Sequence, residues 1–168
     1  SEFWECITSF FNIKFAKPYS YVVKNKNPFF KTKWFGDSYL SYVEHIERNF
    51  QTKQNVIIYT NEKQEDTFIT WNALFTKACE IKKQLLDKGV KKGDSVVGYL
   101  SNHPITIASF LATNSIGAVW SCCSPDFGLE SVISRLGQLK PIVLIGIREY
   151  SYNGKKYKLS DRIKFLQK

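Results

Sequence analysis

An alternation of apolar segments between residues 95 and 147 constrains the fold of this chain more than any other feature. Residues 95–100, 118–122 and 143–147 are short apolar runs of strand length. Between them, residues 105–115 and 129–139 have the length and spacing of helices. Strand, helix, strand, helix, strand is the order of βαβ units, which build parallel sheets. The sequence therefore predicts an α/β fold with a mostly parallel sheet and helices on both faces.

Residues at the ends of these segments support the same interpretation. Pro104 suits the first position of a helix, and Gly117 is placed to end that helix. Residues 118–122 and 143–147 are expected to be buried strands. The helix over 129–139 is expected to face the core with four apolar side chains: Leu129, Val132, Ile133 and Leu136.

The flanking residues extend this pattern. Residues 56–59 and 66–70 predict a hairpin with a polar turn at 61–65. Thr70 can cap the next helix and Gly89 can end it, with one buried stripe of Leu74, Ala78, Ile81 and Leu85. After residue 147, residues 150–158 are polar and turn-rich, and 160–167 predict the start of a further helix.

The first 53 residues differ in character from the rest. Residues 3–13 and 40–50 have apolar side chains at helical spacing, and residues 14–37 predict an irregular, extended segment rich in aromatic rings. Aromatic residues make up 15% of the chain, which favours a well-packed interior. We therefore predict an aromatic-rich N-terminal extension over residues 1–53, followed by the main domain over residues 54–168.

Charge and cysteine content argue against several classes of protein. The formal net charge is +9, which could suit nucleic acid. However, the sequence has no run of five like charges and no basic helix of the nucleic-acid-binding type. The four cysteines (Cys6, Cys79, Cys122 and Cys123) have neither metal-site spacing nor a disulfide framework, which indicates reduced thiols in a cytoplasmic protein. No apolar stretch is long enough for a membrane span, and we expect no signal peptide.

The chain contains none of the common catalytic or phosphate-loop motifs, and its two histidines, His45 and His103, are predicted to be structural. Two loops remain as candidates. Residues 121–128 follow a predicted parallel strand, at the edge where α/β sheets bind ligands. In the alternative interpretation, Ser124 or Asp126 only shapes the turn and caps the next helix. Residues 150–156 are either a basic turn that binds phosphate or a solvated surface turn.

Several short motifs, in order along the chain, resemble the adenylate-forming acyl-CoA synthetases. Residues 88–102 (KGVKKGDSVVGYLSN) look like an early signature of that family, and residues 112–121 (ATNSIGAVWS) resemble its helix-to-strand step. Residues 121–128 (SCCSPDFG) and 152–155 (YNGK) resemble the acetoacetyl-CoA synthetase branch. The aromatic segments at 3–4, 11–15, 33–35 and 40–45 resemble the extension shared by acetyl- and acetoacetyl-CoA synthetases.

This resemblance implies the N-terminal portion of an acid–thiol ligase that converts acetoacetate, ATP and CoA into acetoacetyl-CoA, AMP and pyrophosphate. The whole enzyme would use ATP, CoA and Mg²⁺. Its ATP loop, acidic motif and catalytic lysine are expected beyond residue 168, so the portion is expected to be inactive alone, with no catalytic residue or metal ligand. An acetyl- or propionyl-CoA synthetase is one alternative, and a basic binding or scaffold module is another.

The resemblance also implies that part of the CoA-binding face lies on this chain. The candidates are Lys155, Lys156, Ser151 and Arg135. Ser151 stands where the family has arginine, which reduces the positive charge available for a phosphate, and a surface ion pair is the alternative role of Arg135. Because the family's sheet is larger than the strands predicted here, we also expect an open sheet edge and self-association through it.

Overall fold

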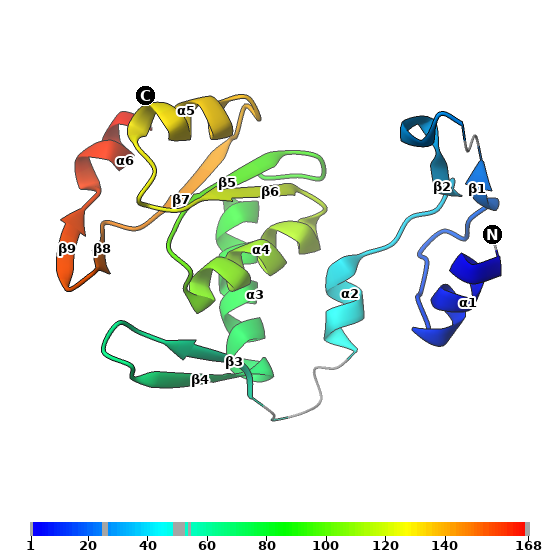
Figure 1. The fold of residues 1–168 in the computed structure, drawn as a ribbon, viewed down its shortest axis with the longest axis horizontal. Coiled ribbons are helices and arrows are strands. Elements are labelled where there is room, and N and C mark those ends of the chain that lie inside the picture. The colour runs from blue at the N-terminus through cyan, green and yellow to red at the C-terminus, as the bar shows by residue number, and fades with distance from the viewer. Residues whose placement is uncertain (1, 25–26, 49–52, 54, 167–168) are drawn as a thin grey trace. The chain divides into compact units, whose positions relative to one another are not determined.

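The computed structural model describes residues 2–24, 27–48, 53 and 55–166, and the chain divides into two compact units, Ser1–Asn49 and Phe50–Lys168 (Figure 1). The sequence predicts a boundary between residues 53 and 54, and residue 54 lies outside the described residues. That boundary stays a prediction.

The first unit contains two short helices and a two-stranded antiparallel sheet. Its elements are α1 (Glu2–Phe10), β1 (Tyr21–Lys24), the 3₁₀ turn η1 (Phe29–Lys31), β2 (Lys33–Gly36) and α2 (Tyr42–Glu47). Both expected helices are present but shorter, and positions 49 and 50 of the second lie outside the described residues. The segment expected to be irregular contains the two strands, with Val23 opposite Trp34. The ladder forms because β-branched and aromatic residues favour extended backbone.

The second unit has a three-stranded parallel sheet with strand order β6-β5-β7. Along the chain its elements are β3 (Asn55–Thr60), β4 (Asp66–Thr70), α3 (Trp71–Asp87), β5 (Ser95–Tyr99), α4 (Pro104–Ile116), β6 (Val119–Cys123), α5 (Leu129–Gly137), β7 (Val143–Gly146), β8 (Glu149–Tyr152), β9 (Lys155–Lys158) and α6 (Ser160–Leu166). β3 pairs with β4, and β8 with β9, as antiparallel hairpins. The expected hairpin at 56–70 and the βαβ order are confirmed.

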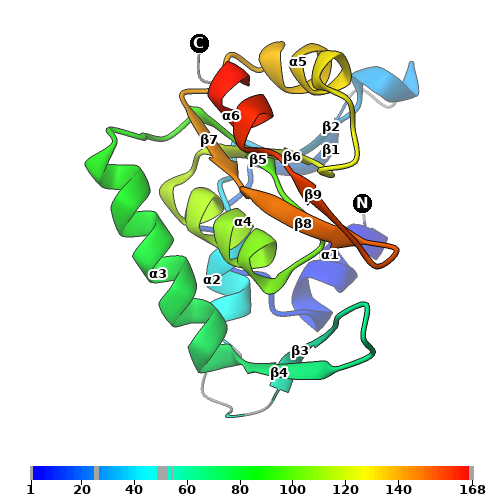
Figure 2. The ribbon, with the colours of Figure 1, turned by 90° about the vertical axis from the view of Figure 1, so that its left-hand side faces the viewer.

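Alternate side chains of β5 point to opposite faces of the sheet, and each face is covered by helices. Val96 packs with Leu85 of α3 and Ala112 of α4. Val97 and Tyr99 belong to a second apolar cluster, which α5 helps to form. Figures 1 and 2 show α3 and α4 on one face of the sheet and α5 and α6 on the other. The prediction of an α/β fold with helices on both faces is therefore confirmed.

The outer strands are less buried than the sequence predicts. Val96 and Tyr99 of the central strand β5 are fully buried, whereas Val119 at the start of β6 is 48% exposed and the apolar residues of β7 are half-buried. The prediction that residues 118–122 and 143–147 are buried strands is therefore wrong. Each is an edge strand of the described sheet, and an apolar sequence does not distinguish an edge from a centre.

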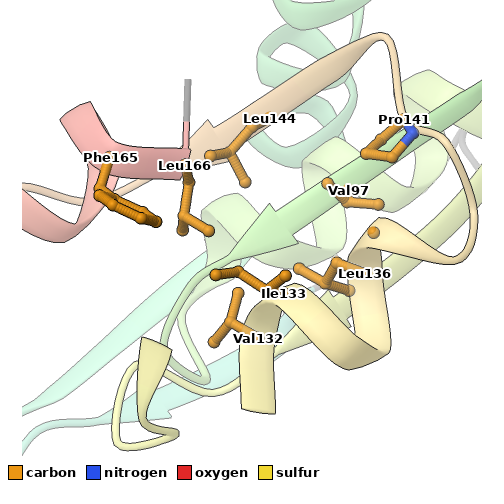
Figure 3. A pocket seen from close by; sticks show the side chains of 9 residues that line it. Val97, Val132, Ile133, Leu136, Pro141, Leu144, Phe165 and Leu166 are labelled. Carbon is orange, nitrogen blue, oxygen red and sulfur yellow. The ribbon is translucent and has the colours of Figure 1, made fainter. Parts of the chain in front are cut away.

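One side chain of α5 is also more exposed than expected. Val132 and Leu136 are buried and Leu129 is half-buried, but Ile133 is 44% exposed. Ile133 instead lines an apolar hollow of about 380 Å³, together with side chains such as Leu144 of β7 (Figure 3). The layer between α5, α6 and the sheet is therefore incompletely filled at this point.

The expected helix ends are confirmed. The Thr70 hydroxyl accepts a hydrogen bond from the Ala73 N–H at 3.2 Å, which caps α3. Pro104 is the first residue of α4. Gly89 and Gly117 have φ angles of +82° and +78°, in the left-handed region that favours glycine after a helix.

Residues 150–158, expected only to be rich in turns, lie in the β8–β9 hairpin. Its two-residue turn is Asn153-Gly154, with φ angles of +50° and +71°. Two consecutive positive φ angles match the twist of the adjoining strands, which is why Asn-Gly favours such turns. The expected helix at 160–167 is present as α6, and residue 167 lies outside the described residues.

Candidate functional site

An open cleft of about 1120 Å³ lies at the carboxyl ends of β5 and β7. Three segments of the second unit form it: the β3–β4 turn, the loop between β5 and α4, and the β8–β9 hairpin. In open α/β sheets, ligands bind beyond the carboxyl ends of the strands. The cleft is therefore the candidate site of this unit.

The charged groups that line the cleft are of both signs. The lining includes Glu62, Glu65, Glu149, Lys63 and Lys156. The carboxylates of the first two accept hydrogen bonds, Glu62 from backbone N–H groups and Glu65 from the side chain of Asn61. Hydrogen bonds to an ionised carboxylate are stronger than those between neutral groups, so these two glutamates are firmly placed within the cleft lining.

Three of the four predicted CoA-face residues lie together on the β8–β9 hairpin. Ser151 and Lys156 are opposite each other in the ladder and both line the cleft, while Lys155 is opposite Tyr152. The Lys156 Nζ lies 3.9 Å from the Glu149 carboxylate. Both side chains are largely exposed, so this ion pair contributes at most about 1 kcal/mol and leaves Lys156 free to turn toward another anion.

The fourth candidate, Arg135, lies elsewhere. It is on α5, and its guanidinium is 4.9 Å from the centre of the Phe127 ring, a cation–π contact. Arg135 is not among the residues that line the cleft. The structure therefore brings Ser151, Lys155 and Lys156 together on one hairpin and places Arg135 outside that group.

His103 has the structural role that the sequence predicts. It is the N-cap of α4, where its Nδ1 accepts a hydrogen bond from the Ile105 N–H at 3.2 Å. Its ring packs edge-on against Tyr59 at 4.8 Å. Burial lowers the pKa of His103, so at neutral pH the ring stays uncharged and Nδ1 keeps the lone pair that the cap requires.

His45 is structural as well. In the first unit its Nε2 accepts a hydrogen bond from the Lys14 N–H at 3.0 Å, and its Nδ1 lies 2.8 Å from the Ser41 carbonyl oxygen. These partners assign the proton to Nδ1 of a neutral ring. His45 thereby joins α2 to the segment that follows α1.

The side chain of Tyr99 contacts the backbone of the loop at 121–128. The Tyr99 hydroxyl lies 2.9 Å from the Pro125 carbonyl oxygen and 2.7 Å from that of Phe127, and accepts a hydrogen bond from Arg162. The expected alternative of a Ser124 or Asp126 cap is wrong, because the N-cap of α5 is Gly128 and no side chain bonds there. The shape of this loop therefore comes from backbone groups and a buried tyrosine.

Sequence reasoning missed two features of the cleft. It treated residues 150–158 as a turn-rich segment, although Asn153-Gly154 between aromatic residues is a recognised signal for a hairpin. It also gave no role to Glu62, whose carboxylate bonds to backbone N–H groups 91 and 92 residues later in the chain. No local pattern identifies such a contact, because it depends on how the two hairpins are placed.

Within residues 2–24, 27–48, 53 and 55–166, no cluster of three or more His, Cys, Asp or Glu side chains could hold a metal ion. None of the helices in this part of the chain has the length and apolar character needed to cross a bilayer.

Comparison with known proteins identifies the family. A model of the family described as "AMP-binding enzyme" matches residues 46–166, well over half of the chain. The chain belongs to the AMP-binding enzyme family. Its resemblance to adenylate-forming acyl-CoA synthetases is thereby confirmed.

Similar proteins within this family include acetoacetyl-CoA synthetases. An acetoacetyl-CoA synthetase of Macaca fascicularis is 32% identical over 170 residues, which cover 100% of this chain and 25% of that protein. One of Rhizobium meliloti (strain 1021) is 33% identical over 136 residues, which cover 81% of this chain and 21% of that protein. The solved acetoacetyl-CoA synthetase from Streptomyces lividans matches with a TM-score of 0.91 and 34% identity, over 98% of this chain and 26% of its own. The chain thus spans about a quarter of the length of these relatives.

Proposed function

We propose that this chain is the N-terminal portion of an ATP-dependent ligase that joins acetoacetate to CoA. The observation that carries the proposal is the match to acetoacetyl-CoA synthetases over nearly the whole chain, at the level of both sequence and fold. Residues 121–128, which the resemblance assigns to the acetoacetate branch, lie at the carboxyl end of β6, where a ligand-binding loop is expected. In this proposal residues 1–53 form the N-terminal extension and residues 54–168 the first part of the AMP-binding domain.

In the whole enzyme, ATP would activate the carboxylate as an acyl-adenylate, with Mg²⁺ neutralising phosphate charge, and CoA would supply the attacking thiol. The residues of the β8–β9 hairpin suit a CoA phosphate, because Lys155 and Lys156 are exposed cations and Ser151 offers a hydroxyl on the facing strand. Their role is to bind and orient. We further propose that the enzyme acts in the cytoplasm and that this unit self-associates through its half-exposed outer strands.

Substrate choice tests the proposed function directly. The full-length protein should form acyl-AMP and acyl-CoA with acetoacetate at a kcat/KM at least tenfold above that for acetate or propionate. Selectivity of that size requires about 1.4 kcal/mol of differential transition-state binding. The measurement is pyrophosphate release with each acid. Equal or greater activity with acetate or propionate would assign the protein to those synthetases instead, and no release with any of the three acids would remove the ligase proposal.

If the β8–β9 hairpin binds CoA, removing its lysines should raise KM for CoA. In the full-length enzyme, Lys155→Ala and Lys156→Ala should each raise KM for CoA about threefold to fivefold, the loss expected for one exposed charge contact of up to about 1 kcal/mol. The KM for ATP should not change. Lys158→Ala is the matched control for Lys156→Ala, because Lys158 is an exposed lysine of the same strand that, unlike Lys156, does not line the cleft. If the CoA dependence of both variants equals that of the control, this hairpin does not bind CoA.

A further inference from the structure

One carboxylate joins two hairpins that both line the cleft. Glu62, in the β3–β4 turn, accepts hydrogen bonds from the backbone N–H groups of Asn153 at 2.5 Å and Gly154 at 3.2 Å. Figures 1 and 2 both show the β3–β4 turn and the β8–β9 turn side by side. Since both N–H groups belong to one tight turn, a single side chain binds the whole tip of the second hairpin.

The turn that carries Glu62 is well ordered by its own hydrogen bonds. The Asn61 side-chain oxygen accepts from the N–H groups of Lys63 at 2.9 Å and Glu65 at 3.1 Å, and its side-chain nitrogen donates to the Glu65 carboxylate at 2.8 Å. The backbone closes the same turn, since the Asn61 N–H donates to the Glu65 carbonyl at 3.2 Å. The backbone position of Glu62 is therefore fixed by the hydrogen bonds of its turn.

The receiving turn is just as constrained. Asn153 and Gly154 are the only two residues between β8 and β9, and their positive φ angles define one compact turn shape. In that shape their two N–H groups point toward the same carboxylate. Hydrogen bonds from neutral donors to an ionised acceptor are about twice as strong as those between neutral groups. Because both turns are rigid, the contact fixes the position of the β8–β9 turn relative to the β3–β4 turn. The same contact between flexible loops would not.

We infer that Glu62 is a positioning residue that fixes the β8–β9 hairpin over the cleft. By binding the hairpin at its tip, it sets where Lys155, next to the turn, and Lys156, in the cleft wall, present their charges. The inference rests on the proposed function for its consequence, which is the affinity for CoA. Glu62 itself bears a negative charge and binds to backbone, so it acts through the hairpin and not on the phosphate.

Hydrogen–deuterium exchange in the full-length protein tests the contact without any ligand. Glu62→Ala should accelerate exchange at the amides of Asn153 and Gly154 about tenfold, since it removes the acceptor of both. Glu65→Gln is the matched control: it removes one negative charge from the same turn and keeps an oxygen that can accept from Asn61. If Glu62→Ala and Glu65→Gln give the same exchange at these two amides, the carboxylate does not hold the turn and the inference fails.

Kinetics separate this inference from the function on which it rests. Glu62→Ala should raise KM for CoA by about the same factor as Lys155→Ala, with KM for ATP unchanged and kcat within about twofold. Faster exchange with an unchanged KM for CoA, while Lys155→Ala does raise it, would overturn the positioning role and leave the CoA face intact. If neither variant alters KM for CoA, the proposed CoA face itself is wrong.

Discussion

Replacing Gly98 with valine should lower the free energy of unfolding by about 3 kcal/mol, the upper end of the range for overpacking a core. Gly98 is in the central strand β5, on the same face as Val96, and it lies against the Trp120 ring of the neighbouring strand. A Cβ at this position would be 2.8 Å from Trp120 Cη2 and 2.9 Å from Cζ2. Valine adds two further methyl groups in the same space. Urea denaturation monitored by circular dichroism measures the loss.

Two comparisons show whether space is the cause. Gly137→Ala is the matched control, because a Cβ on Gly137 would meet no atom within 4 Å; its stability should equal or slightly exceed that of the parent. Trp120→Leu should reduce the penalty of Gly98→Ala, because it removes the ring that the new Cβ would contact. If the penalty of Gly98→Ala is the same with and without Trp120, the close approach of the ring does not explain why glycine is required.

Replacing Tyr99 with phenylalanine should cost about 2 kcal/mol, although the two side chains have almost the same shape. The Tyr99 side chain is 0% exposed, and its hydroxyl serves the carbonyl oxygens of Pro125 and Phe127. Without it, these acceptors lose a buried donor, which costs about 1–3 kcal/mol. The midpoint of thermal unfolding should fall accordingly, by about 4–8 °C, because each kcal/mol shifts it by about 2–4 °C in a chain of this length.

The loss should be localised to the loop that Tyr99 holds. Exchange of the amides at 124–128 should accelerate in Tyr99→Phe more than exchange in α3. Tyr152→Phe removes the hydroxyl of a tyrosine that is 64% exposed and should leave stability unchanged within about 0.5 kcal/mol. Equal stability of Tyr99→Phe and Tyr152→Phe would show that the buried hydroxyl contributes nothing net to this loop.

The elements that the sequence predicts best are those with local signals at both ends. The α3 helix follows from the Thr70 cap, a buried stripe and Gly89, and α4 from Pro104 and Gly117. These residues act within one or two turns of the backbone, so their effect depends little on the rest of the fold. The parallel sheet follows equally well, because βαβ connections permit few other arrangements.

Burial and the walls of the cleft were harder to predict, because they depend on neighbours that are distant in sequence. Val119 and Val96 are the same residue type in similar apolar segments, so the sequence gives them the same expected burial. Only Val96 lies in a strand that is paired on both sides. Of the site candidates, Ser151, Lys155 and Lys156 lie near each other because they share one hairpin. Arg135 lies on a separate helix, and the contact between Glu62 and the hairpin turn joins segments that no sequence window contains together.

The position of β5 between its two partners affects how this unit would form on the ribosome. β5 is the first of the three parallel strands to be synthesised, and β7, which covers its second edge, follows only on the order of 50 residues later. At translation rates of about 5–20 residues per second, the apolar residues Val96 and Val97 would wait for several seconds before both edges of their strand are paired. Early in that interval, α3 is complete and α4 is still being synthesised, so only the face of β5 that these two helices cover can be shielded. A nascent chain stalled before residue 143 should therefore be a substrate for chaperones that bind extended apolar segments.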